Sequence, residues 1–226
     1  MQPKLFTTRI CPYAQRCVIV LLEKGIDHQI VYITPGEYPE GFEKISPQKK
    51  VPVLVTHEGA IVDSVAINEY LEDAYPEPLL PQGTYERAWS RSWIEFCGPC
   101  MSDFGTMILA KTASEFEAAR HALMGKLDLV EAHCLARHMV GTKLSLVDCT
   151  FAPLLQRLWF LHDRSGGVME ERRHPGIVAW GHRLMASRSV IDSLHDSAMA
   201  SFLDFLQARD SHVACMAPLD HATAAA

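Results

Sequence analysis

The stretch Cys11-Pro12-Tyr13-Ala14-Gln15-Arg16 decides how the first part of this 226-residue chain is interpreted. It follows a short apolar segment at residues 5–6 and precedes apolar positions with helical spacing at residues 18–22. The period therefore changes here from that of a strand to that of an amphipathic helix. Pro12 suits the first helical position, because its missing N–H would have no intrahelical partner there. The sequence predicts that Cys11 lies at a strand-to-helix junction.

This junction is a place where a thiol becomes reactive. The free N–H groups and the positive dipole end of a new helix stabilise a thiolate, and cysteines so placed often have a pKa of roughly 3.5–7.5. We therefore expect Cys11 to have the lowest pKa of the seven thiols. The alternative is that Cys11 is a small buried hydrophobe.

The thiol has no local partner, because Ala14 occupies the position of the second cysteine in a C-x-x-C pair. A mixed disulfide at Cys11 must then be resolved by an external thiol. Glutathione is the abundant candidate in a reducing cytosol.

The first eighty residues alternate between the period of strands and that of helices. Strands are predicted at about 5–6, 28–33, 51–55 and 60–62, and helices after Cys11, within 36–45, and from Ser64 to before Pro76. The order β-α-β-α-β-β-α is that of the thioredoxin fold.

A proline-rich linker at residues 76–83 separates this part from a second half in which no convincing strand is found. Helices are predicted at about 84–110, 114–139, 146–163, 175–186 and 199–208. We expect a thioredoxin-like α/β domain at residues 1–78, an all-helical domain at 84–210 and a loose tail at 211–226.

Charge and cysteine content exclude several classes of function. The formal net charge of −6 argues against nucleic acid or an anionic membrane as the main partner. The apolar run at residues 17–22 is far too short to span a membrane. An odd number of cysteines and the absence of an apolar leader predict a cytoplasmic protein with free thiols.

Two further segments are candidates for binding a peptide. Val51-Pro52 opens a strand, and a cis bond there would turn the backbone of Val51 outward, where a peptide can pair with it. The alternative is an ordinary proline at the start of an edge strand. Lys50 either pairs with a peptide carboxylate or is solvated surface.

Asp63-Ser64 stands at the start of the next predicted helix. The Ser64 hydroxyl and the first N–H groups suit a carboxylate, and Asp63 suits an ammonium group. Together they fit the α-amino acid end of a γ-glutamyl peptide. The alternative is a simple helix N-cap, and both roles are compatible.

These motifs, in this order and spacing, together with the helical second half, resemble the cytosolic glutathione transferases over about residues 4–210. The cysteine-type omega, lambda and dehydroascorbate-reductase classes, or a bacterial relative of them, are the most similar. The resemblance implies the glutathione transferase fold, glutathione as co-substrate and a homodimer. It implies a catalytic Cys11 and glutathione-binding roles for Tyr13, Lys50, Val51, Pro52, Asp63 and Ser64.

The implied reaction is glutathione-dependent thiol transfer or reduction, acting on a small electrophilic or disulfide substrate through a Cys11–glutathione disulfide. Deglutathionylation and dehydroascorbate-type reduction both fit. Ala14 departs from the second cysteine that plant dehydroascorbate reductases often carry, which leaves the substrate open. The alternatives are a conjugating or isomerising transferase, and a binding protein of the same fold without turnover.

Other motifs are interpreted as structural. Cys97-Gly98-Pro99-Cys100 copies the thioredoxin motif, but it follows a helical run rather than a strand. A regulatory disulfide or metal contact is the alternative there. No pair of histidines has metal-binding helical spacing, so no metal is expected. Ser145 and Asp148 predict a capping box.

Overall fold

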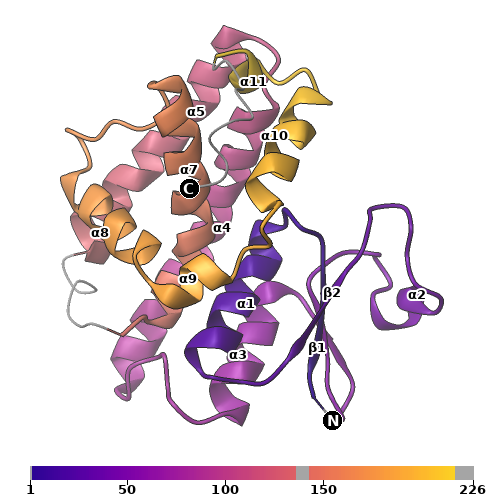
Figure 1. Ribbon diagram of the computed structural model, residues 1–226. Helices are drawn as coiled ribbons and strands as arrows, with labels where there is room; N and C mark the ends of the chain where they lie inside the picture. The colour runs from indigo at the N-terminus through magenta and orange to yellow at the C-terminus, as the bar shows by residue number, and fades with distance from the viewer. Residues whose placement is uncertain (1, 136–142, 217–226) are drawn as a thin grey trace.

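The computed structural model describes residues 2–135 and 143–216. Its first part is a β/α unit and its second part is helical, and the two pack side by side (Figure 1). The elements of the first part are β1 (Lys4–Thr7), α1 (Pro12–Glu23), β2 (Gln29–Tyr32), α2 (Phe42–Ile45), β3 (Val53–Val55), β4 (Ala60–Val62) and α3 (Ser64–Ala74). Their order confirms the predicted thioredoxin-like fold.

The four strands form one mixed sheet in the order β2-β1-β3-β4. Strand β1 lies in the middle, parallel to β2 and antiparallel to β3, with Leu5 opposite both Ile30 and Leu54. Helices α1 and α3 pack against each other and cover the face of the sheet that is turned to the helical part (Figure 1). Because β1 is central, the turn that follows it carries Cys11 to the middle of one end of the sheet.

The second part is built around the long helices α4 (Thr84–Leu109), α5 (Ala113–Leu129) and α7 (Leu146–Ser165). The remaining elements are η1 (Val130–Cys134), α8 (Pro175–Met185), α9 (Arg188–Asp192), α10 (Ala198–Gln207) and α11 (His212–Met216). The predicted helices correspond to α4, α5 with η1, α7, α8 and α10; residues 136–139 of one prediction lie outside the described residues. The sequence analysis missed α9 and α11, because a helix of five residues is too short to show a helical period of apolar positions.

The beginning of the segment predicted to be a loose tail is packed. Ser211 and Val213 are buried, and the Ser211 hydroxyl donates to the carbonyl oxygen of Ile108. The backbone N–H of His212 donates to the carbonyl of Ala110. These contacts join α11 to the end of α4, so the prediction is wrong for residues 211–216, and residues 217–226 lie outside the described residues.

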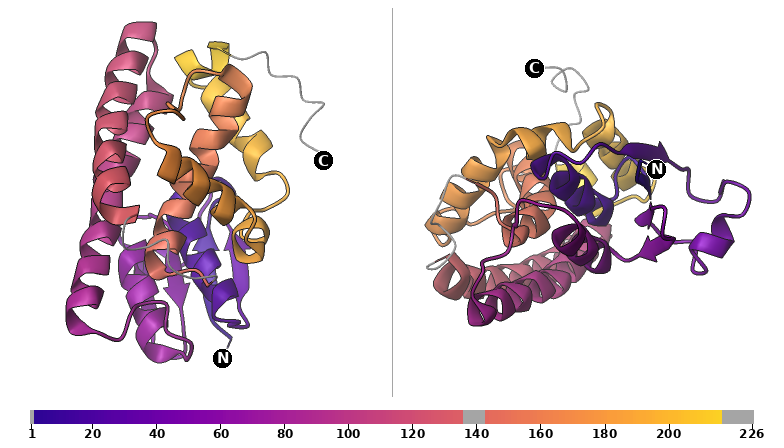
Figure 2. Two further views of the ribbon diagram at one scale, coloured as in Figure 1. Left: turned by 90° about the vertical axis from the view of Figure 1, so that its left-hand side faces the viewer. Right: turned by 90° about the horizontal axis from the view of Figure 1, so that it is seen from below.

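One apolar core runs through both parts of the chain. Helix α1 packs against α7 and α9 of the helical part, as the views in Figure 2 also show. The core cluster contains residues of the sheet and of α1 together with residues of α4 and α7. The two parts therefore share an interface that buries apolar surface on both sides.

A buried ion pair fixes the linker between the parts. Lys24 Nζ lies 3.0 Å from the Glu72 carboxylate, and both side chains are almost fully excluded from solvent. Lys24 also donates to the carbonyls of residues 75–77, and Glu72 accepts the N–H groups of Leu79 and Leu80. The pair therefore provides hydrogen-bond partners for backbone groups at the start of the linker.

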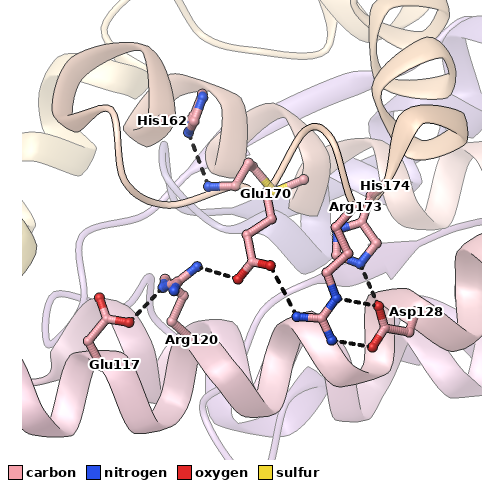
Figure 3. A network of polar contacts seen from close by, with 8 residues as sticks. Glu117, Arg120, Asp128, His162, Glu170, Arg173 and His174 are labelled. Atoms are coloured by element: carbon pink, nitrogen blue, oxygen red, sulfur yellow. Dashed lines mark hydrogen bonds and ion pairs between the residues drawn. The ribbon is translucent and has the colours of Figure 1, made fainter.

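A polar network on the surface anchors the loop between α7 and α8 to α5 (Figure 3). Glu170 accepts hydrogen bonds from Arg120 at 2.9 Å and from Arg173 at 3.1 Å. Arg173 binds both oxygens of Asp128, and Asp128 also contacts the buried His174 ring. The network therefore holds the loop that leads into α8.

No helix in the described part of the chain is long and apolar enough to cross a membrane.

Candidate functional site

Cys11 is the N-cap residue of α1, as the sequence predicted. Its Sγ accepts a hydrogen bond from the backbone N–H of Ala14 at 3.4 Å, and Pro12 is the first helical residue. The thiol is partly exposed, whereas five of the other cysteines are buried. Cys215 in α11 is exposed. The structure thus brings one thiol to the start of a helix and to a cavity.

The electrostatic surroundings of Cys11 differ from the prediction. Burial raises the pKa of the Cys11 thiol above its usual value, and the N–H groups of Ala14 and Tyr13 and the guanidinium groups of Arg157 and Arg16 act in the opposite direction. The expectation of a lowered pKa is therefore wrong for the protein without a ligand, because desolvation exceeds the stabilisation by the helix start.

Three buried thiols of the helical part have strongly raised pKa values. Burial raises the pKa of Cys97 to about 11, and that of Cys100 and Cys134 to about 12. These three side chains are completely buried or nearly so, and none lies at the start of a helix. Cys11 combines a route from solvent with helix N–H donors and two nearby cations.

All the residues predicted to bind glutathione line a single cavity of about 720 Å³. Its walls include Tyr13, Lys50, Val51, Pro52, Asp63 and Ser64. The residues come from three separate segments, namely the start of α1, the loop before β3 and the start of α3. The structure therefore brings the predicted residues together at one cavity, and their roles in binding glutathione stay predictions.

The loop before β3 presents free backbone groups to this cavity. The Val51–Pro52 peptide bond is cis. The Ser46 hydroxyl holds the loop by accepting from the N–H of Lys50 and donating to its carbonyl oxygen. Within the described part of the chain, no hydrogen bond occupies the backbone N–H or C=O of Val51. A bound peptide can therefore pair with Val51 as with a strand edge.

Asp63 and Ser64 form the opposite wall. Asp63 is the N-cap of α3, with φ of 76°, and its Oδ1 accepts the N–H groups of Val65 at 2.8 Å and Ala66 at 3.3 Å. Its carboxylate is exposed, and Oδ2 has no partner among the described residues. One oxygen therefore caps the helix, and the other remains available to an ammonium group. Ser64, the next residue, is buried.

Cys11 itself lines a second cavity, of about 610 Å³, between the two parts of the chain. Tyr13 borders both cavities. The helical part supplies apolar side chains to the wall, namely Met101, Phe104, Ile108, Phe202 and Phe205. Cys11 therefore lies on the wall of the second cavity, two residues before the tyrosine that borders both cavities.

Arg157 is a residue of this site that the sequence analysis missed. It lies on α7, is only 2% exposed, and donates to Gln15 Oε1 at 2.7 Å, to the Pro153 carbonyl at 2.9 Å and to the Ile10 carbonyl at 3.1 Å. Burial lowers the pKa of Arg157 to about 10, and Cys11 opposes this shift. The available signal was an arginine among the inward-facing leucines of a predicted helix.

The motifs interpreted as structural have structural surroundings. Cys97 and Cys100 lie inside α4, completely buried, and the Cys97 sulfur accepts a hydrogen bond from Arg16 at 3.2 Å. Ser145 and Asp148 form the predicted capping box of α7. Asp148 also accepts the indole N–H of Trp180 at 2.6 Å. In the part of the chain that the structure describes, no group of three His, Cys, Asp or Glu side chains is placed to hold a metal ion.

A thioredoxin-like domain joined to an all-helical domain, with a cavity between the two, is the glutathione transferase architecture. The chain also matches two family models, "Glutathione S-transferase, N-terminal domain" over residues 5–79 and "Glutathione S-transferase, C-terminal domain" over residues 113–180. It is 34% identical to glutathione S-transferase omega-1 of Rattus norvegicus over 162 residues, which are 70% of this chain and 67% of that protein. The chain belongs to the glutathione S-transferase family.

Solved structures with similar folds include two transferases of different classes. Rice GST1 (OsGSTU1), solved in complex with glutathione, superposes with a TM-score of 0.82 at 25% identity, covering 92% of this chain and 96% of that one. Glutathione transferase Omega 3C from Trametes versicolor gives a TM-score of 0.77 at 26% identity, covering 85% of this chain and 89% of that one.

Proposed function

We propose that this glutathione S-transferase is a cysteine-type thiol transferase that reduces mixed disulfides of glutathione. The observation that carries the proposal is the position of Cys11, which caps α1 beside a peptide-sized cavity and lines a second, largely apolar one. The similarity to an omega-1 enzyme supports the cysteine type.

The reaction consists of two thiol–disulfide exchanges. The Cys11 thiolate attacks the glutathionyl sulfur of the substrate, the S–S bond of the substrate breaks, and the other thiolate leaves and takes up a proton. A second glutathione thiolate then attacks the Cys11–glutathione disulfide, which releases glutathione disulfide and regenerates the Cys11 thiolate. Over the cycle one glutathione thiol is oxidised and the sulfur of the leaving group is reduced to a thiol, while the glutathionyl sulfur of the substrate stays at the disulfide level.

The glutathione half of the substrate lies in the 720 Å³ cavity in this proposal. The backbone of Val51 pairs with the cysteinyl unit, Asp63 and Ser64 bind the γ-glutamyl end, and Lys50 contacts a carboxylate of the tripeptide. Tyr13 and Pro52 shape the wall between these contacts. The helix start at Cys11 and the nearby Arg157 stabilise the thiolate as the bound peptide arrives.

A second candidate function is conjugation, in which the enzyme activates the thiolate of glutathione itself. Tyr13 favours it, because its ring borders both cavities and burial raises the pKa of its hydroxyl, so that it stays protonated and can donate to a thiolate. Conjugation of an aryl halide by a Cys11→Ser variant, with loss of that activity in a Tyr13→Phe variant, would favour this second function.

Mass mapping tests the first proposal. Brief treatment with glutathione disulfide near neutral pH should add one glutathione at Cys11 before any at Cys215, the exposed thiol in α11. A Cys11→Ser variant should lose turnover of a glutathione mixed disulfide, whereas Cys215→Ser should keep it. Earlier modification of Cys97, Cys100 or Cys134 would exclude the assignment.

We also propose that the protein acts in the cytoplasm as a homodimer. All seven cysteines are free, which suits a reducing compartment. Val62 in β4 and Tyr85 in α4 are large apolar side chains that are 45% and 66% exposed, and a second copy would bury such groups. Light scattering after gel filtration measures the mass directly.

A further inference from the structure

The cavity beside Cys11 combines apolar walls with three arginines. Arg9 comes from the turn between β1 and α1, Arg157 from α7, and Arg209 from the segment after α10. Among the residues that the structure describes, no Asp or Glu side chain lines this cavity. The chain as a whole has a formal net charge of −6, so this local positive charge runs against the overall balance.

The three guanidinium groups have no acidic partner in the described part of the chain. Among residues 2–135 and 143–216, none of them forms an ion pair with a carboxylate. Arg157 is only 2% exposed, and its Nε has no hydrogen-bond partner among the described residues. A buried cation without a compensating anion is costly, and cavities with such a charge attract anions.

The three arginines have different surroundings. Arg157 lies close enough to Cys11 for the two charges to influence each other, so a Cys11 thiolate balances it. Arg9 is exposed, and the guanidinium of Arg209 lies 3.8 Å from the ring centroid of Phe205. Arg9 and Arg209 therefore remain available to a ligand, and Phe205 joins one of them to the apolar wall.

We propose that the preferred leaving group of the substrate is an apolar thiol that carries a carboxylate, with the apolar body against Phe104, Ile108 and Phe202 and the carboxylate at Arg9 and Arg209. This inference rests on the proposed thiol transfer and assigns its substrate class. Arginine binds a carboxylate through two parallel hydrogen bonds, which gives orientation as well as affinity. A cavity of about 610 Å³ has the size of a small-molecule site.

Binding without turnover tests the inference independently of catalysis. Calorimetry with the Cys11→Ser protein compares 4-ethylbenzoate with 4-ethylbenzamide, which have the same shape and differ in charge. We expect the benzoate to bind at least ten-fold more tightly, and this preference to disappear in an added Arg9→Gln/Arg209→Gln pair. Arg172→Gln removes the same charge from an exposed arginine outside the cavity and should keep the preference. Equal affinities, or no binding of either compound, would overturn the inference.

Turnover separates this inference from the proposed function. The substrates are the glutathione mixed disulfides of 4-(2-mercaptoethyl)benzoate and 4-(2-mercaptoethyl)benzamide, whose leaving thiols are nearly identical because the substituent is remote from sulfur. We expect kcat/KM to be at least ten-fold higher for the benzoate, with a ratio that falls towards one in the Arg9→Gln/Arg209→Gln enzyme. Equal turnover of both would overturn the inference and leave the function intact. Turnover of neither, with selective benzoate binding, would contradict the proposed function and leave only the carboxylate-binding site at Arg9 and Arg209 supported.

Discussion

Arg157 in the helical part donates a hydrogen bond to the carbonyl oxygen of Ile10, the residue directly before Cys11, at 3.1 Å. The same guanidinium donates to Gln15 on the first turn of α1. A side chain of α7 therefore holds the peptide group between Ile10 and Cys11 in place. Arg157 also contributes a positive charge that favours the thiolate of Cys11.

Removal of this charge should slow the chemistry of Cys11. In a Cys215→Ser background, Arg157→Met should reduce the rate of Cys11 alkylation by iodoacetamide at pH 7 by about ten-fold, because each unit of rise in the pKa lowers the thiolate fraction ten-fold. The pH at which alkylation is half-maximal should move upward. Arg157→Lys, which keeps the charge, should fall between this variant and the wild type.

Arg164→Met is the matched control, since Arg164 lies on the same helix and stacks on Phe160 away from the thiol. It should leave the alkylation profile unchanged. A profile that is the same in Arg157→Met as in the wild type would show that Arg157 only positions the backbone.

Two substitutions of Asp63 should distinguish its role as the cap of α3 from its proposed role in binding glutathione. Asp63→Ala removes the cap of α3 and should cost about 1 kcal/mol of stability, whereas Asp63→Asn keeps an acceptor for the N–H groups of Val65 and Ala66. Both variants lose the charge that we propose binds the ammonium group of glutathione. Both should therefore raise KM for glutathione by roughly ten-fold with a smaller change in kcat. Normal KM in Asp63→Asn would assign Asp63 to capping alone.

Cys97 and Cys100 should be dispensable for turnover. Both thiols lie inside α4, where no free N–H groups are available to stabilise a thiolate, and burial raises the pKa of both. The double Ser variant should keep near wild-type thiol transfer. It should lose about 1–3 kcal/mol of unfolding free energy in urea, because buried hydroxyls replace buried thiols. Loss of most activity in a folded variant would reveal a second redox centre.

The buried pair of Lys24 and Glu72 should dominate the stability of the linker. Lys24→Met leaves a carboxylate and three carbonyl groups without their cation, and should lower the unfolding free energy by about 3–5 kcal/mol. Lys143→Met at the exposed pair with Glu77 is the control and should change stability by less than about 1 kcal/mol. Chemical denaturation measures both, and similar losses would contradict the importance of burial.

The sequence predicted the features that depend on neighbouring residues. Pro12 places the start of α1, Ser145 and Asp148 the start of α7, and the alternation of periods the order of the sheet elements. Short motifs at the ends of the predicted segments marked the candidate glutathione-binding residues, and these residues line one cavity. Their roles in binding stay predictions.

The remaining features depend on contacts between distant residues. Arg157 reaches residues that are 142 and 147 positions away in the chain, and no local pattern predicts such a contact. The raised pKa of Cys11 comes from burial in the folded protein, which opposes the effect of its own helix start and is not visible in the local sequence. Helices α9 and α11 are fixed by what they pack against rather than by their own period.

The hydrogen bond from Arg157 to Ile10 also limits how such proteins can be recombined. A crossover in the linker at residues 76–83 would give the thioredoxin-like half a new helical partner, and with it a new pocket for the electrophile. It would also remove the cation and the donor that act on the peptide before Cys11. Exchange of the helical half would therefore change the reactivity of Cys11 as well as the substrate specificity. Both would be separable only if the incoming half carried an arginine at the position of Arg157 on its equivalent of α7.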